Sequence, residues 1–122
     1  MGLGYFFDTY ALVEIATANP LFSKYSSEYG EITIFNLAEI YWVTLNGHGA
    51  EYADRTFNRF KEYVVDVSDD VLKKAIAFRH KHKKQNLSYA DCIGYVHALE
   101  NNLKFLTGDR AFEKLANVEF VK

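Results

Sequence analysis

The sequence is poor in cysteine, with Cys92 as the single example among 122 residues. One cysteine cannot form an internal disulfide, and it argues against a cysteine-based zinc site. A metal bound by this chain would therefore be held mainly by oxygen ligands. That inference directs attention to the aspartates and glutamates.

Long hydrophobic runs are also missing, because charged or polar residues interrupt every apolar stretch before it reaches the roughly 18 residues of a membrane-spanning helix. The N-terminal segment, residues 1–8, lacks the basic start of a secretory signal and reaches an acid too soon. We therefore expect no membrane segment and a cytoplasmic location.

Neither sign of charge is in large excess: 14 Lys and Arg stand against 16 Asp and Glu, a formal net charge of -2. This balance argues against a strongly basic nucleic-acid scaffold, although it leaves local basic patches open. With 49% hydrophobic and 16% aromatic residues, we expect one compact domain over residues 1–122.

The apolar residues predict strands that alternate with helices. Buried or β-branched runs indicate strands at residues 4–8, 31–35, 64–67, 104–107 and 118–121. Helical spacing indicates helices over residues 9–18, 21–29, 37–47, 50–63, 68–84, 88–101 and 110–115. Connections of this length suit parallel crossovers. We therefore expect an α/β fold of three layers, with a central, mostly parallel sheet of about five strands flanked by helices.

Four carboxylate residues are predicted at one edge of this sheet. Asp8 ends the first strand, Glu39 lies one turn into the helix after the second, and Asp109 follows the fourth strand by two residues. Asp91 lies in the first turn of the helix that begins near Ser88. Because ligands bind beyond the carboxyl ends of parallel strands, we expect the four side chains to converge.

Each acid taken singly has a simpler interpretation as a helix cap, in which its side chain accepts a hydrogen bond from a free backbone amide. The candidate caps are the Asn36-x-x-Glu39 and Ser88-x-x-Asp91 capping boxes and the single residues Asp8 and Asp109. Capping does not explain why four acids gather with no obvious basic partner beyond Arg110. Like charges this close repel each other unless a cation lies between them.

A divalent cation such as magnesium resolves this repulsion, because it prefers oxygen ligands and combines one or two carboxylates with substrate phosphate. Such a site is typical of metal-assisted phosphodiester hydrolysis. The acidic positions therefore indicate a phosphate-cleaving enzyme.

The same four positions carry a family resemblance. Four segments resemble, in order, the acidic motifs of the PIN-domain family: Phe7-Asp8-Thr9-Tyr10-Ala11-Leu12, Asn36-Leu37-Ala38-Glu39-Ile40, Leu87-Ser88-Tyr89-Ala90-Asp91-Cys92-Ile93 and Leu106-Thr107-Gly108-Asp109-Arg110-Ala111-Phe112. The match covers almost the whole chain. Its small size is most similar to the VapC-type toxins of toxin-antitoxin pairs.

This resemblance implies a five-stranded parallel sheet and a magnesium- or manganese-dependent endoribonuclease that acts on RNA. It implies that the catalytic and metal-binding residues are Asp8, Glu39, Asp91 and Asp109. A homodimer and a small antitoxin protein that covers the site are also implied. The hydroxyls of Thr9 and Thr107 could bind the substrate phosphate or a metal-bound water, or could cap helices. Other single-domain PIN proteins serve RNA processing, which is the alternative within the family.

Two further features have open interpretations. The densest basic run, residues 79–84, could attract an RNA backbone, or could be the solvated end of a helix whose cations suit the helix dipole; we favour the second. Tyr41 and Trp42 on the Glu39 helix could face a second copy or an antitoxin, or could belong to the core.

Two classes of protein compete with the nuclease. A receiver-type signalling domain shares the alternating elements and an aspartate-magnesium pocket, but it needs paired acids after the first strand, where Asp8 stands alone. It also needs a phospho-acceptor after the third strand, whereas Asp66 lies inside that predicted strand. A catalytically inert binding module would have no physical reason to keep four mutually repelling carboxylates.

Overall fold

The computed structural model describes residues 4–122; residues 1–3, part of the segment considered above as a signal sequence, lie outside the description. Its centre is a parallel sheet in the order β2-β1-β3-β4. The strands are β1 (Tyr5–Phe7), β2 (Gly30–Glu31), β3 (Lys104–Thr107) and β4 (Val118–Phe120). The predicted α/β architecture is confirmed, with four strands in the described part of the chain instead of about five.

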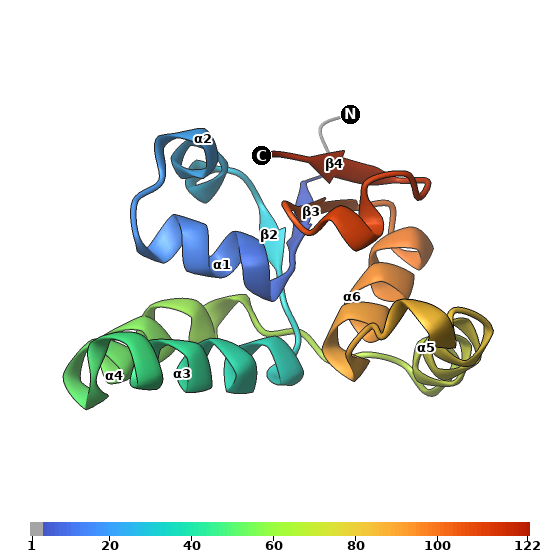
Figure 1. Cartoon of the computed structure of the whole chain (residues 1–122), viewed down its shortest axis with the longest axis horizontal. Helices are drawn as coiled ribbons and strands as arrows, with labels where there is room; N and C mark the ends of the chain where they lie inside the picture. The colour runs from blue at the N-terminus through green and yellow to red at the C-terminus, as the bar shows by residue number, and fades with distance from the viewer. Residues whose placement is uncertain (1–3) are drawn as a thin grey trace.

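Six α-helices and four short 3-10 helices connect these strands within residues 4–122. The α-helices are α1 (Thr9–Ala16), α2 (Pro20–Ser23), α3 (Ile34–His48), α4 (Ala50–Phe60), α5 (Asp69–Lys81) and α6 (Tyr89–Glu100). The 3-10 helices are η1 (Lys24–Ser27), η2 (Lys61–Tyr63), η3 (Lys83–Gln85) and η4 (Arg110–Phe112). Figure 1 shows α3 and α4 lying side by side as one pair, and α5 and α6 as a second pair. In the described range, no helix combines the length and apolarity needed to cross a membrane.

The predicted strand at residues 64–67 is wrong. Val64 forms only an isolated parallel bridge with Ile32, in which the Val65 amide donates to the Ile32 carbonyl at 2.9 Å. The ladder stops there because β2 ends at Glu31 and the chain turns into α3 directly afterwards. No length of neighbouring strand follows for this segment to pair with.

The predicted second strand, residues 31–35, is too long because Thr33 starts a helix. The Thr33 hydroxyl accepts a hydrogen bond from the Asn36 amide at 3.4 Å, and the Asn36 side chain accepts one from the Thr33 amide at 2.9 Å. This reciprocal capping box begins α3 at Ile34. Asn36 is therefore the third residue of the helix, and the box predicted between Asn36 and Glu39 is replaced by this one.

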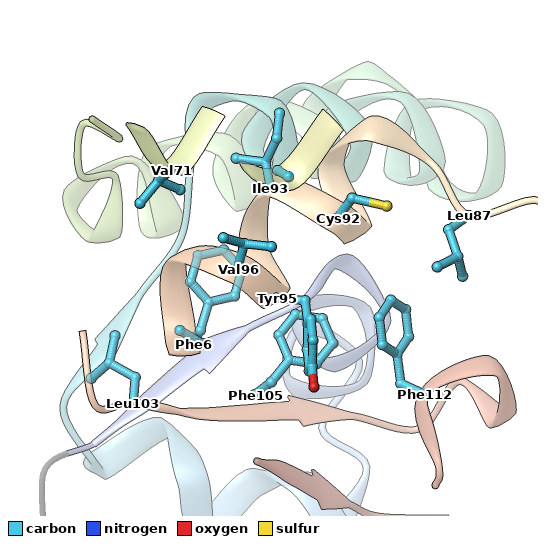
Figure 2. Close-up of a cluster of buried hydrophobic side chains, with 12 residues drawn as sticks. Phe6, Val71, Leu87, Cys92, Ile93, Tyr95, Val96, Leu103, Phe105 and Phe112 are labelled. Carbon is cyan, nitrogen blue, oxygen red and sulfur yellow. The ribbon is translucent and has the colours of Figure 1, made fainter. Parts of the chain in front are cut away.

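Successive strand side chains point to opposite faces of the sheet. Phe6 and Phe105 point to one face, where they pack against α5 and α6, whereas Phe7 and Leu106 point to the other, where they pack against α1 and α3. Figure 2 shows the first cluster, in which the Tyr95 ring lies edge-on to Phe105 with centroids 5.5 Å apart. Because helices cover both faces, β1 and β3 present apolar side chains to both sides of the sheet.

Gly94 of α6 lies directly against Phe6. A Cβ atom at position 94 would lie 2.4 Å from the Phe6 ring, and Phe6 is fully buried, so the ring has no free space to move into. We expect Gly94→Ala to lower the free energy of unfolding by about 2 kcal/mol, measured by urea denaturation.

Gly47→Ala is the matched control, because Gly47 lies in α3 and a Cβ atom there would meet nothing within 4 Å. The higher helix propensity of alanine should raise the free energy of unfolding by about 0.5 kcal/mol. Equal effects of the two substitutions would contradict the close packing of α6 on β1.

Candidate metal-binding site

All four predicted acids line one pocket of about 460 Å³. Asp8 reaches it from the end of β1, Glu39 from α3, Asp91 from the first turn of α6 and Asp109 from the segment after β3. The remaining residues that line this pocket are Thr9, Tyr10, Val13, Glu14, Val43 and Ser88. None of the lining residues is basic. The fold therefore brings together carboxylates that lie far apart in the sequence.

The pocket lies at the carboxyl edge of the sheet, where β1 and β3 are neighbours. The chain leaves β1 for β2 on one side and later reaches β3 on the other. In open parallel sheets, such a switch point is where ligands bind. The Asp8 amide donates to the Leu106 carbonyl at 3.3 Å, which fixes Asp8 beside the strand that leads to Asp109.

Three of the four acids also cap helices, as the simpler interpretation predicted. One carboxylate oxygen of each accepts a hydrogen bond from a backbone amide: Ala11 to Asp8 at 2.8 Å, Ser88 to Asp91 at 3.1 Å and Ala111 to Asp109 at 2.9 Å. Each of these bonds engages a single oxygen. Capping therefore orients the carboxyl groups and is compatible with metal binding through the second oxygen.

Glu39 is held by a side chain instead of a backbone amide. Its Oε1 accepts a hydrogen bond from the Thr9 hydroxyl at 2.5 Å. The Thr9 hydroxyl in turn accepts one from the Asn36 side chain at 3.4 Å. Thr9 is the first residue of α1, whose cap is Asp8, so the capping interpretation of Thr9 is wrong. Its place in the pocket lining favours a role in orienting Glu39.

Thr107 lies behind the pocket and is not among its lining residues. It is fully buried, and its hydroxyl accepts a hydrogen bond from the Asp109 amide at 2.9 Å. A hydrogen bond from Thr107 to Asp8 also lowers the pKa of Asp8. This placement favours positioning of two acids over direct contact with a phosphate.

Burial dominates the ionisation of Asp8 and raises its pKa to about 8. The hydrogen bonds from Thr107 and the Ala11 amide lower the pKa, while the charges of Asp91 and Asp109 raise it. Without a cation, Asp8 therefore holds a proton at neutral pH.

The pKa of Asp91 is also raised. Burial raises its pKa, hydrogen bonds from Ser88 lower it, and the nearby charges of Glu39 and Asp109 raise it. The acids are thus close enough to repel one another across the pocket. A bound cation would reverse the effect by favouring the ionised carboxylates.

Two basic residues lie close to the Asp109 segment but pair with groups other than the four acids. Arg110, the basic neighbour expected from the sequence, pairs with Glu113 at 3.3 Å. Lys122 donates to the Gly108 carbonyl at 3.0 Å. Lys122 also lies 4.9 Å from the ring centroid of Tyr10, which lines the pocket. Across residues 4–122, the salt bridges do not include any of the four acids.

The donor chemistry of the pocket fits a hard divalent cation. Its charged lining groups are carboxylates, the oxygen ligands that magnesium and manganese prefer. Over the described residues, no three Asp, Glu, His or Cys side chains lie close enough together to hold one metal ion by themselves. An open, oxygen-lined pocket of this kind suits an ion that keeps several waters and binds substrate phosphate directly.

Glu14 is a lining residue that was not predicted from the sequence. Its carboxylate accepts a hydrogen bond from the Asn19 side chain at 2.5 Å. Glu14 lies four residues after Tyr10 on α1, and Val43 lies four residues after Glu39 on α3. Side chains at this spacing share a helix face. The helical spacing of Glu14 from Tyr10 and of Val43 from Glu39 was therefore the sequence signal that could have identified these two lining residues.

The fold and the pocket define an α/β protein with an acidic ligand site at the switch point of its sheet. More specifically, residues 5–118 match the family described as PIN domain. The chain therefore belongs to the PIN-domain family, and the resemblance seen in the four motifs is confirmed. No curated protein matches it in sequence.

Several solved structures share this fold. Mycobacterium tuberculosis VapC20, described as a toxin that cleaves the sarcin-ricin loop, has 16% identity and a TM-score of 0.80, with coverage of 98% of this chain and 100% of that one. A toxin-antitoxin complex from Klebsiella pneumoniae has 17% identity and a TM-score of 0.74, with coverage of 95% and 96%. VapBC2 from Rickettsia felis, solved with a DNA fragment from its promoter, has 16% identity and a TM-score of 0.73, with coverage of 97% and 98%. At these identities the likeness establishes the fold.

Proposed function

We propose that this chain is an endoribonuclease that hydrolyses RNA phosphodiester bonds with a magnesium or manganese ion. The observation that carries the proposal is the convergence of Asp8, Glu39, Asp91 and Asp109 on one pocket without a basic lining residue. Membership of the PIN-domain family supports it. The description of VapC20 as a cleaving toxin supports the same chemistry.

Asp8, Glu39, Asp91 and Asp109 would hold the ion between them, some directly and some through its bound waters. When bound, the ion supplies positive charge that offsets the charge developing on the phosphate during hydrolysis. Asp8 holds a proton at neutral pH when no cation is present, because its pKa is about 8. Formation of the loaded site is therefore coupled to proton release from Asp8.

The remaining lining residues position the acids and the substrate. Thr9 holds Glu39 through its hydroxyl. Tyr10, Val13 and Val43 give the pocket an apolar side, which can contact a base or ribose while the carboxylates face the phosphate. The chain thus supplies separate surfaces for the charged and uncharged parts of a nucleotide.

The proposal is tested by incubating the purified chain with a panel of end-labelled, single-stranded and hairpin RNAs. We expect internal cleavage in Mg²⁺ or Mn²⁺, no cleavage in excess EDTA, and recovery when the metal is restored. Cleavage that persists undiminished in EDTA, or no cleavage of any RNA with either metal, would contradict the proposal. The second result would favour the inert binding module.

We propose further that this ribonuclease is the toxin of a toxin-antitoxin pair, with an RNA-processing nuclease and a receiver domain as the alternatives. The PIN-domain match argues against a receiver domain, because the matched family spans nearly the whole chain. A nuclease of RNA processing would share the chemistry and differ in its partners.

A cytoplasmic location stays a prediction.

We also propose a homodimer and a small antitoxin protein as the partner. The exposed apolar side chains of α3 support a protein partner; they are Ile34, Phe35, Trp42, Val43 and Leu45. Trp42 is 67% exposed, so the core interpretation is wrong for it, whereas Tyr41 packs against Phe57 of α4. Val43 also lines the acidic pocket. A protein bound along α3 would therefore reach the edge of the site, as an inhibitor must.

A further inference from the structure

An exposed tyrosine stands beside the acidic pocket and is held in place by an arginine. Tyr89 is the first residue of α6 and is 56% exposed. The Arg79 guanidinium of α5 lies 4.2 Å from the centroid of the Tyr89 ring. Arg79 is itself anchored, because its Nε donates to the Leu87 carbonyl at 2.9 Å. The pair therefore presents a flat aromatic surface whose orientation is fixed before any ligand arrives.

The position of this pair connects it to the pocket. Tyr89 directly follows Ser88, which lines the pocket, and Asp91 lies two residues further on. Neighbouring Cα atoms lie about 3.8 Å apart. Tyr89 does not itself line the pocket, and its side chain leaves α6 on a different face from Asp91. An RNA chain that continues past Ser88 at the rim of the pocket would therefore meet the Tyr89 ring outside the pocket.

The charge around the pair is positive. Arg79 and Lys81 lie in the last turn of α5, and Lys83 and Lys84 lie beyond the helix in η3. Lys81, Lys83 and Lys84 are exposed, and across residues 4–122 the salt bridges involve none of them. The helix dipole acts only within the last turn. The dipole therefore does not explain why Lys83 and Lys84 lie beyond the end of α5.

We propose that Arg79 and Tyr89 form a stacking platform for an unpaired base of an RNA that runs past the acidic pocket, with the three lysines binding the flanking RNA backbone. The proposal rests on the proposed ribonuclease function for its ligand. Aromatic rings stack on any base, and arginine adds a cation–π contribution. Basic side chains around such a ring bind phosphates without reading sequence. The favoured ligand is therefore single-stranded RNA of relaxed sequence.

The test measures binding separately from cleavage, by fluorescence anisotropy of a labelled single-stranded RNA in EDTA at low salt. We expect Tyr89→Ala to weaken binding on the order of tenfold and Tyr89→Trp to retain it. Replacing Lys81, Lys83 and Lys84 by glutamine should reduce the slope of log affinity against log salt by about 2. Tyr29→Ala and Lys73→Gln are the controls and should change neither quantity. Tyr29 is 59% exposed but lies beside the amino end of β1, at the opposite edge of the sheet.

An RNA of the same length with abasic residues separates stacking from a structural role. On that RNA, wild type and Tyr89→Ala should bind equally. Equal affinity of the two proteins for normal RNA, a Tyr89→Ala defect that persists on abasic RNA, or no RNA binding by wild type would each overturn the platform. Binding that depends on Tyr89 in a chain that never cleaves RNA would overturn the proposed function and leave the platform standing.

Discussion

Replacing Asp91 by asparagine is expected to reduce RNA cleavage in Mg²⁺ at least about a hundredfold, because losing a metal ligand removes several kcal/mol of charge stabilisation. The fold should persist. The Asp91 oxygen that caps α6 accepts a hydrogen bond from the Ser88 amide, and an asparagine oxygen can accept the same bond. The measurement is single-turnover cleavage of a labelled RNA, with circular dichroism to confirm the fold.

Asp69→Asn is the matched control, since Asp69 is an exposed acid in the first turn of α5. It removes the same charge from the first turn of a helix outside the pocket, so its cleavage rate should equal that of wild type. If Asp91→Asn and Asp69→Asn were equally active, the assignment of Asp91 to the reaction would be wrong.

The second large effect is on stability without metal, where Asp8→Asn should make the protein more stable than wild type at pH 8. The pKa of Asp8 is raised to about 8 in the folded chain, against about 4 in an unfolded chain. Between these values the folded state holds a proton that the unfolded state has released. The stabilisation from protonation is therefore fully present below about pH 4 and is lost as the pH rises through 8.

The measurement is urea denaturation in EDTA from pH 5 to 8. The free energy of unfolding of wild type should fall relative to Asp8→Asn by up to about 1.4 kcal/mol per pH unit. The difference between the two proteins removes the contribution of the histidines, which titrate in both. Saturating Mn²⁺ should abolish the fall, because the ion replaces the proton. Parallel stability curves for the two proteins in EDTA would contradict the buried, proton-holding Asp8.

Asp8 and Asp109 could be placed at the site from sequence because each follows a strand whose end is clear. Asp8 comes directly after a buried apolar strand, and Asp109 follows Leu106 and Thr107 at the end of another. In a parallel sheet these ends share an edge, so strand order was not needed to expect convergence. The sequence patterns that predict helix caps also mark the site here, since Asp8, Asp91 and Asp109 all take part in helix caps.

One feature was missed because two local signals compete, and several others because they depend on contacts between distant segments. The β-branched residues after Glu31 are typical of a strand, but the capping box between Thr33 and Asn36 starts a helix there instead. The 64–67 segment had the right composition and lacked a partner strand of sufficient length. The hydrogen bond from Thr9 to Glu39 joins α1 to α3, and no local sequence pattern predicts it. The pairing of Arg79 with Tyr89 likewise needs the α5 and α6 arrangement.

The most direct test of the central claim is to count bound manganese by the loss of the free Mn²⁺ signal in electron paramagnetic resonance. We expect wild type to bind about one or two ions per chain, with Mg²⁺ as a competitor and with proton release at neutral pH. Asp8→Asn should bind much more weakly. Mn²⁺ binding by Asp8→Asn equal to that of wild type, or no binding by wild type, would contradict a cation site built from these converging carboxylates.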